Sequence, residues 1–153
     1  MKQSNRYVVF SLDGQRYALH LSAVERVIRV VEMTSLPKTP DIVLGIVNVE
    51  GQIIPIVNIR KRFRLPEREL DLSDVLIIAQ IPRRTVALVA DNVSGVIEGS
   101  EQDITEAKEI FPRMEYVKGV VKLKDGLVLI HDLDKFLSLE EDKELDSALK
   151  KKR

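Results

Sequence analysis

The segment Gly45–Arg60, GIVNVEGQIIPIVNIR, decides how this chain folds. Two runs of apolar, mostly β-branched residues flank the dipeptide Glu50-Gly51, and glycine tolerates the positive φ angle that a tight turn requires. The segment therefore predicts two short strands, Leu44–Val49 and Ile53–Val57, joined by a hairpin turn. Asn58 follows the second strand, and its side-chain oxygen is suited to cap the first turn of a short helix.

The same pattern occurs a second time in the other half of the chain. Gly119–Val121 corresponds to Gly45–Val47, and Asp132 ends the second copy as Asn58 ends the first. Further pairs keep a nearly constant offset: Ala18 and Ala87, Val24 and Val93, Val27 and Val96, Ile54 and Val128, and Ile56 and Ile130. Such an internal repeat predicts two similar small barrels.

The two repeats are too small to be independent domains. Halves of about 70 residues bury too little apolar surface to be stable alone, so we expect them to share strands or to pack face to face. We place the division between the barrels near 65–73, where Pro66 and acidic residues resemble a linker. The chain is thus predicted to be one domain, residues 1–153, with two interleaved barrels.

Short strands bounded by turn residues recur along the rest of the chain. Leu36–Pro40 is expected to be a loop, because proline lacks the amide donor that a sheet requires. Leu139–Lys151 carries Leu145, Ala148 and Leu149 on one face and predicts an amphipathic helix. The other predicted strands are Tyr7–Leu12, Arg16–His20, Val24–Val31, Val75–Gln80, Thr85–Ala90, Val93–Ile97, Val117–Leu123 and Leu127–Ile130.

Composition is that of a soluble globular protein. Of the 153 residues, 44% are hydrophobic and 31% charged, and 24 Lys+Arg residues balance 24 Asp+Glu residues. A formal net charge of zero removes the long-range attraction to nucleic acid or to an anionic membrane. No apolar run reaches the roughly 20 residues of a membrane helix, and the N-terminal apolar stretch is too short for a secretory signal. We therefore expect a cytoplasmic protein with no direct membrane contact.

The residue types that carry catalysis do not form a recognisable site. The chain has no cysteine, which excludes disulfides, thiolate catalysis and cysteine-based zinc sites. Its two histidines, His20 and His131, lack metal-ligand spacing and are interpreted as surface or hydrogen-bonded side chains. The carboxylates between Glu98 and Glu106 indicate a solvated acidic turn. We predict no enzymatic activity, no catalytic residue, no cofactor and no metal.

One dense basic segment, Arg60–Arg64, leaves an alternative open. Basic clusters of this kind bind nucleic acid in some small barrels. Glu67 and Glu69 follow at once and the net charge is zero, so we favour a solvated helical turn and predict no nucleic-acid partner. A duplicated small barrel that binds nucleic acid through Arg60–Arg64 and the lysine-rich C-terminal tail is the alternative function.

The segment Gly45–Arg60 closely resembles the signature of the chemotaxis coupling proteins, the CheW-like family. That signature reads Gly-x-x-Asn-x-Arg-Gly, followed by apolar-Pro-apolar-apolar-Asp-Leu-Arg. Val86–Val96 is similar to the second sequence block of the family, and Leu139–Leu149 is similar to its C-terminal helix. The resemblance therefore extends from Tyr7 to Leu149, over nearly the whole chain.

This resemblance implies a fold, a function and two partners. The fold is mainly β, with two intertwined five-stranded SH3-like barrels, short helices and a C-terminal amphipathic helix. The function is that of a non-enzymatic adaptor in chemotaxis-type signal transduction. Its partners are the tip of a methyl-accepting chemoreceptor and the regulatory domain of the sensor histidine kinase, which shares the fold. The helical hairpin of the receptor is expected in an apolar groove between the barrels.

The resemblance also assigns candidate residues to each partner. The matching receptor-binding positions are Val24, Val27, Val93 and Val96, with Glu50 at the edge of the groove. Contact with the kinase is expected on the loop formed by Thr39, Pro40, Asp41, Ile42 and Val43, together with Gly45.

The chain departs from the family pattern at three charged positions. Arg26 stands where members usually have Glu, and Glu50 stands where they usually have Arg. Two opposite reversals predict that Arg26 and Glu50 face each other and keep an ion pair with exchanged ends. Asn58 replaces the usual Asp, which preserves the helix cap and loses the charge. An exposed pair contributes only about 0–1 kcal/mol to stability, so we expect it to affect the choice of receptor instead.

Overall fold

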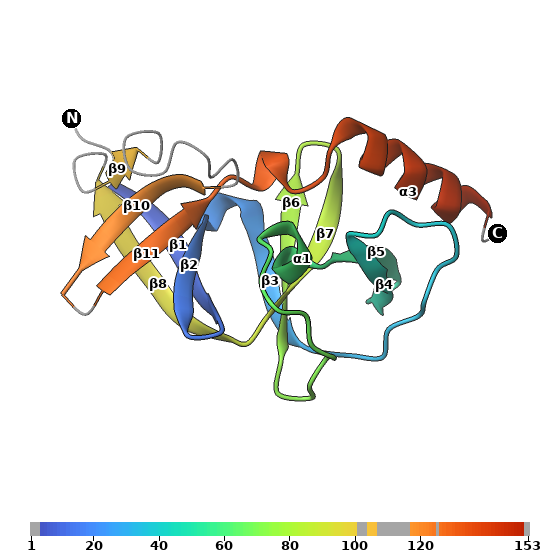
Figure 1. The fold of residues 1–153 in the computed structure, drawn as a ribbon, viewed down its shortest axis with the longest axis horizontal. Helices are drawn as coiled ribbons and strands as arrows, with labels where there is room; N and C mark the ends of the chain where they lie inside the picture. The colour runs from blue at the N-terminus through green and yellow to red at the C-terminus, as the bar shows by residue number, and fades with distance from the viewer. Residues whose placement is uncertain (1–3, 101–103, 107–116, 125, 152–153) are drawn as a thin grey trace.

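The fold consists almost entirely of β-strands (Figure 1). The computed structural model describes residues 4–100, 104–106, 117–124 and 126–151. The strands are β1 (Ser4–Leu12), β2 (Gln15–His20), β3 (Val24–Arg29), β4 (Val43–Val49), β5 (Gln52–Val57), β6 (Val75–Ile81), β7 (Arg84–Ala90), β8 (Asn92–Ser100), β9 (Ile104–Glu106), β10 (Val117–Leu123) and β11 (Gly126–His131). The helical segments are η1 (Leu21–Ala23), α1 (Ile59–Arg62), η3 (Leu133–Lys135) and α3 (Leu139–Lys151).

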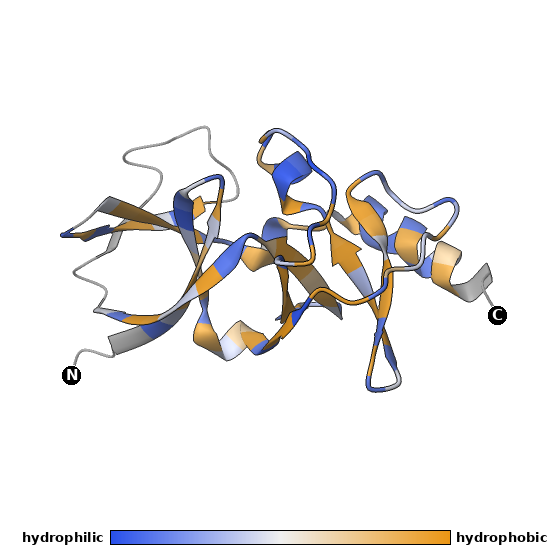
Figure 2. Ribbon diagram, turned by 90° about the horizontal axis from the view of Figure 1, so that it is seen from below, coloured by the Kyte–Doolittle hydropathy of each residue, from blue (hydrophilic) through white to orange (hydrophobic). Residues whose placement is uncertain are grey.

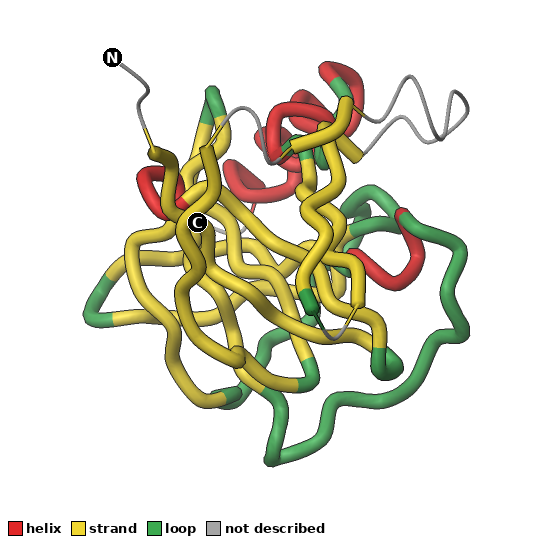
Figure 3. The backbone as a smooth tube through the Cα atoms, turned by 90° about the vertical axis from the view of Figure 1, so that its left-hand side faces the viewer, coloured by secondary structure: helices red, strands yellow, loops and turns green. Residues whose placement is uncertain are grey.

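The strands form two sheets, each of which takes strands from both halves of the chain. One has the order β8-β1-β2-β11-β10-β9 and is called the six-stranded barrel below. The other has the order β3-β6-β7-β5-β4 and is called the five-stranded barrel. In Figure 3 the strands are seen to curve around the body of the molecule. The predicted pair of intertwined barrels is confirmed, with one additional strand, β9, which pairs with β10.

The internal repeat accounts for both strand orders. When the two orders are aligned, β3 corresponds to β8, β6 to β1, β7 to β2, β5 to β11 and β4 to β10. Each barrel also contains one parallel pair at the equivalent place, β2 with β11 and β7 with β5. The repeated sequence therefore builds the same arrangement twice, although neither copy forms a barrel by itself.

Among the described strands, consecutive strands belong to different barrels at two places, β2 to β3 and β7 to β8. The chain leaves the six-stranded barrel through η1, after β2, and returns at Asp91, the single residue between β7 and β8. The segment 65–73 joins α1 to β6, and β5 and β6 belong to the same five-stranded barrel. The region where the two sequence repeats meet is thus not a crossing between barrels.

Several strands are buried on both faces, because the barrels also pack against each other. Along β7, Ala87 faces the interior of the five-stranded barrel, whereas Val86 and Leu88 belong to a cluster that includes residues of both barrels. We call this cluster the inter-barrel core; its largest fully buried members include Phe10, Leu12, Leu19, Ile59, Ile77, Leu88, Phe136 and Leu145. Two-sided burial explains why these strands are continuous apolar runs (Figure 2).

The C-terminal helix α3 has the bounds that the sequence predicts. It begins with a capping box: the Glu141 amide donates to Ser138 Oγ at 3.1 Å, and the Ser138 amide donates to Glu141 Oε1 at 2.9 Å. Leu145 is fully buried in the inter-barrel core, and Ala148 packs against a second cluster with Leu36 and Ile46. None of the described helices has the length and apolar character needed to cross a membrane.

Candidate partner-binding surfaces

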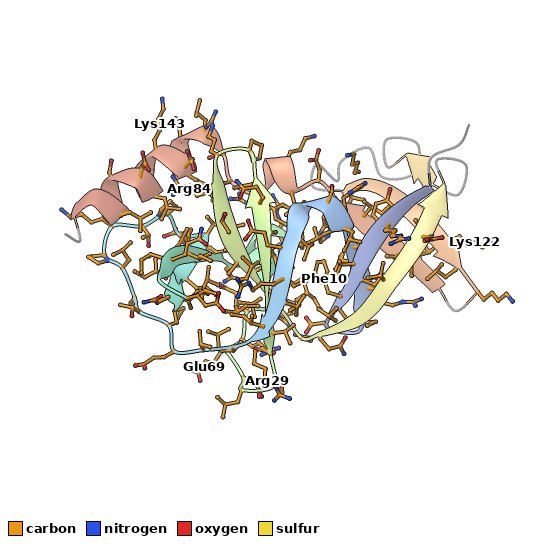
Figure 4. All side chains as sticks on the ribbon, turned by 180° about the vertical axis from the view of Figure 1, so that it is seen from behind. Phe10, Arg29, Glu69, Arg84, Lys122 and Lys143 are labelled. Atoms are coloured by element: carbon orange, nitrogen blue, oxygen red, sulfur yellow. The ribbon has the colours of Figure 1, made fainter. Side chains whose placement is uncertain are left out.

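The four candidate receptor-binding valines lie at equivalent positions on β3 and β8. Val27 pairs with Ile77 of β6, and Val96 pairs with Val8 of β1, so each lies on the outer face of its barrel. Both are well exposed, Val27 to 40% and Val96 to 53%. In Figure 4, β3 and β8 lie at the front of the molecule, and Phe10 of the inter-barrel core lies between them.

The other two valines are anchored instead of exposed. Val24 pairs with Ala79 and Val93 pairs with Phe10, and both valines are half-buried against the inter-barrel core. Each strand has a register irregularity directly after this valine, and such bulges bend the strand locally. Each barrel therefore has one half-buried and one exposed valine on the strand at its edge.

Arg26 and Glu50 come together as the sequence predicts. The Arg26 guanidinium lies 3.2 Å from the Glu50 carboxylate and joins β3 to the β4–β5 turn. Both side chains are largely exposed, at 44% and 75%. The hydrogen bond from Arg26 lowers the pKa of Glu50, assisted by the charge of the guanidinium. Arg26 precedes Val27 in β3 and pairs with Ile78, whereas Val27 pairs with Ile77, so the two side chains point to opposite faces of the strand.

Most of the candidate kinase-binding segment is buried within the chain. Pro40, Ile42, Val43 and Gly45 are buried, Thr39 is half-buried, and Asp41 is the exposed member. Gly45 has a clear reason to be glycine, since an added Cβ would lie 2.6 Å from the Thr34 carbonyl oxygen. This approach accompanies a bridge between Thr34 and Ile46, which holds the loop against the edge of β4.

The basic segment Arg60–Arg64 is not the solvated turn that its composition suggests. Arg60 is buried, with 7% of its surface exposed. Its guanidinium forms ion pairs with the carboxylates of Asp13 and Asp91, at 2.9 and 2.8 Å. Arg62 pairs with Glu141 at the start of α3. Arg60 and Arg62 thus form internal contacts, whereas Lys61 and Arg64 are exposed, so the segment presents fewer basic side chains than the alternative of a nucleic-acid-binding surface requires.

The histidines have different environments from each other. The Ser22 hydroxyl lies 2.6 Å from His20 Nδ1, and the Ser22 amide donates to the same nitrogen, so His20 caps η1. His131, in contrast, is buried, and neither of its ring nitrogens has a hydrogen-bond partner among the described residues. The interpretation of His131 as a surface or hydrogen-bonded side chain was therefore wrong. Within the described ranges, no group of three His, Cys, Asp or Glu residues is arranged to hold a metal.

The candidate acidic turn is mostly strand or lies outside the described residues. Glu98 belongs to β8 and forms an exposed ion pair with Arg6 of β1 at 3.2 Å. Glu106 belongs to β9. Glu101 and Asp103 lie outside the described residues.

A polar network that the sequence did not predict joins the two barrels. It consists of Arg60, Arg68, Asp13, Asp74 and Asp91, connected by close ion pairs. Burial alone would raise the pKa of Asp91, but the Asp13 amide and the two guanidinium groups outweigh it and hold that pKa below its usual value. The sequence signal was weak: Asp13 looks like an ordinary turn residue, and Asp91 like the end of a strand.

Two interleaved small barrels, each with an exposed valine on an edge strand, have the architecture of a scaffold that binds other proteins. The chain belongs to the CheW-like domain family, which matches residues 6–141. It is 28% identical to a chemotaxis protein CheW of Klebsiella aerogenes over 146 residues, covering 94% of this chain and 88% of that protein. A chemotaxis protein CheW of Thermotoga maritima is 31% identical over 130 residues, covering 84% of each.

A solved structure shows the same fold. The scaffolding protein TtCheW from Thermoanaerobacter tengcongensis superposes with a TM-score of 0.82 at 29% sequence identity, covering 91% of this chain and 96% of that one. The prediction of a non-enzymatic CheW-like chemotaxis adaptor is confirmed at the level of the family. Membership implies a kinase and a chemoreceptor as partners.

Proposed function

We propose that this chain couples a chemoreceptor to a histidine kinase by binding both at the same time on separate surfaces. The observation that carries the proposal is the pair of exposed valines, Val27 and Val96, at equivalent positions of two edge strands. One valine belongs to each barrel, so a partner that contacts both must lie across the two barrels. The affinity of such a partner therefore depends on the position of one barrel relative to the other.

The receptor surface is formed by β3 and β8. Val27 and Val96 supply the exposed apolar area, while Val24 and Val93 anchor their strands on the inter-barrel core. A helical hairpin with apolar side chains suits this surface, because the chain has no net charge to attract a partner over long range. Glu50 is bound to Arg26 of β3, the strand that carries Val27, and we assign it to the edge of this surface because both charged side chains are exposed.

The kinase surface is formed by the loop 39–43 and Gly45. Asp41 is the exposed side chain, and the buried residues Ile42 and Val43 fix the course of the loop beneath it. This loop lies at the start of β4, whereas the turn after the other end of β4 contacts β3 through Glu50 and Arg26. A partner bound here leaves β3 and β8 accessible, as an adaptor requires.

The test compares aspartate substitutions at apolar positions of similar exposure. Val27→Asp and Val96→Asp place a charge on the receptor surface, whereas Leu127→Asp does so on β11, where Leu127 is 47% exposed. We expect the first two variants to lose receptor pull-down and keep kinase pull-down, with an unchanged circular dichroism spectrum, while Leu127→Asp keeps both. Receptor binding that survives both valine substitutions would remove the surface from consideration.

The reversed ion pair is tested in the same assay. Arg26→Glu combined with Glu50→Arg restores the usual polarity of the family and preserves the attraction between the two side chains. We expect this double variant to remain folded and to bind its own receptor more weakly, because the partner side chains would meet charges of the opposite sign. Equal binding of the native and the double-variant protein would show that the polarity of this pair does not select the receptor.

A further inference from the structure

Asp91 occupies one of the two places where consecutive described strands belong to different barrels. It is the single residue between β7 of the five-stranded barrel and β8 of the six-stranded barrel. A connection this short transmits any rotation of one barrel directly to the strand that follows. A rotation of one barrel relative to the other therefore changes the backbone angles at or next to Asp91.

The backbone and side chain of Asp91 are both held in place. Its amide donates to the Ser11 carbonyl at 2.9 Å, and its Oδ2 accepts from the Asp13 amide at 2.8 Å. These two contacts fasten it to β1 and to the β1–β2 turn of the six-stranded barrel. Its Oδ1 accepts from Arg60 at 2.8 Å and also from Arg68. One carboxylate thus contacts residues on both sides of the crossing.

The two arginines extend the network into the five-stranded barrel. Arg60 lies in α1, directly after β5, and also donates to both carboxylate oxygens of Asp13 at 2.9 Å. Arg68 binds the buried carboxylate of Asp74 through two nitrogens, at 2.9 and 2.6 Å. Multiple charge-assisted hydrogen bonds of this kind are directional, unlike the apolar contacts of the inter-barrel core.

The network touches both strands of the proposed receptor surface. β8 begins at Asn92, immediately after Asp91. At the other end of the network, the Asp74 carbonyl accepts from the amide of Val30, the residue that follows β3, at 3.2 Å. A change in the network therefore acts on the ends of β3 and β8 together.

We propose that the network around Asp91 fixes the angle between the two barrels, and with it the spacing of β3 and β8. The inter-barrel core keeps the barrels in contact, while the ion pairs select one orientation among the packings that such a core permits. Asp91, Asp13 and Arg60 are positioning residues in this view, since they act through β3 and β8 and do not contact the partner. The consequence for receptor binding rests on the proposed function, whereas the role of the network in fixing the angle between the barrels does not.

The test measures the distance between the barrels in the isolated protein. The natural chain has no cysteine, so Gln52→Cys on β5 and Lys122→Cys on β10 create one spin-label pair across the barrels. We expect a single narrow distance distribution by pulsed electron paramagnetic resonance. Asp91→Asn, which removes the charge and keeps the shape, should broaden or shift this distribution, and Asp13→Asn should do the same.

Two controls separate a change of orientation from a general loss of structure. Glu98→Gln breaks an ion pair between β1 and β8, which belong to the same barrel, and should leave the distribution unchanged. A second label pair within the five-stranded barrel, at Gln52 and Gln80, should stay narrow in every variant. An unchanged inter-barrel distance in both Asp91→Asn and Asp13→Asn would overturn the proposal.

Receptor pull-down of the same variants distinguishes this inference from the proposed function. Weaker receptor binding by Asp91→Asn, together with a broadened distance, supports both. If the distance broadens while Val27→Asp and Val96→Asp still bind the receptor, the receptor surface is misplaced and the role of Asp91 in orienting the barrels stands.

Discussion

His131 lies in the inter-barrel core among aromatic rings, in an environment that does not tolerate its charged form. The ring centroids of Phe63 and Tyr17 are 4.1 and 4.6 Å from the centroid of His131, and those of Phe136 and Phe10 are 5.5 and 5.7 Å away. Burial lowers the pKa of His131 to about 3. A proton that binds in the unfolded chain near pH 6.5 is thus excluded from the folded protein until far lower pH.

This difference predicts a specific loss of stability in acid. Below the unfolded pKa the unfolded state binds one proton more than the folded state, so the free energy of unfolding falls as the pH falls, by up to about 1.4 kcal/mol per pH unit. His131→Phe keeps an aromatic ring and removes the proton site. We expect urea denaturation between about pH 6 and 4 to show a shallower pH dependence for this variant.

His131→Phe also changes the free energy of unfolding at every pH, because phenylalanine is larger and overpacking costs free energy. The quantity to compare is therefore the change of the free energy of unfolding with pH. Carboxylates such as Asp91 and Glu50, whose pKa values are lowered, contribute the same slope to both proteins. Parallel pH profiles for the native protein and the variant would show that His131 takes up its proton without unfolding.

The Asn58 cap can be predicted from the sequence, whereas the burial of His131 and Arg60 cannot, for a physical reason. The Asn58 cap is local: its Oδ1 accepts from the Lys61 amide at 3.2 Å, three residues away, as its position before a helix predicts. The surroundings of His131 and Arg60 depend on segments far away in the chain. The sequence around a single histidine or a run of arginines does not indicate which distant segments will pack against it. The burial of His131 and Arg60 could therefore not be predicted.

At the scale of the elements, α3 combines a local start signal with a long-range anchor. Its N-terminal turn carries Glu140, Glu141 and Asp142, which suit the positive end of the helix dipole. Arg84 of β7 then holds the helix through Asp142 at 2.6 Å and Asp146 at 3.2 Å. These polar contacts orient the helix, while Leu145 supplies the fully buried apolar side chain.

Truncating Leu145 should therefore destabilise the whole protein. Leu145→Ala leaves a cavity in the inter-barrel core, and such substitutions cost about 2–5 kcal/mol. Ser147→Ala is the matched control, because Ser147 is exposed on the same helix. Chemical denaturation should show a large decrease for the first variant and a change within about 0.5 kcal/mol for the second. A small effect of Leu145→Ala would mean that α3 is docked by its ion pairs instead.

The elements themselves were largely predictable, because apolar runs and turn residues are local features. The strand Val117–Leu123 and the helix Leu139–Lys151 have the predicted bounds, and the other predicted strands differ by a few residues at their ends. β9 was missed because its three residues lie beside acidic side chains that suggest a solvated turn. It is defined by pairing with β10, and pairing is not visible in a segment this short.

At the scale of the whole molecule, the barrels depend on each other. The repeat and the small size of each half predicted that strands would be shared, but not which strands would change sides. The exchange of β1 and β2 for β6 and β7 is decided by long-range pairing. As a result, the largest apolar cluster belongs to neither barrel alone, and it includes residues of both.

A shared core of this kind should make the two barrels unfold as one unit. Ile56 and Ile130 are equivalent in the repeat, and each is buried inside its own barrel, Ile56 in the five-stranded and Ile130 in the six-stranded one. Ile56→Val and Ile130→Val remove the same methylene group, at a cost of about 0.5–1.5 kcal/mol each. We expect native-state hydrogen exchange to show that either variant lowers the protection of the slowest amides in both barrels by the same free energy. If each substitution lowered protection only within its own barrel, the barrels would be independent folding units and the inter-barrel core would not couple them.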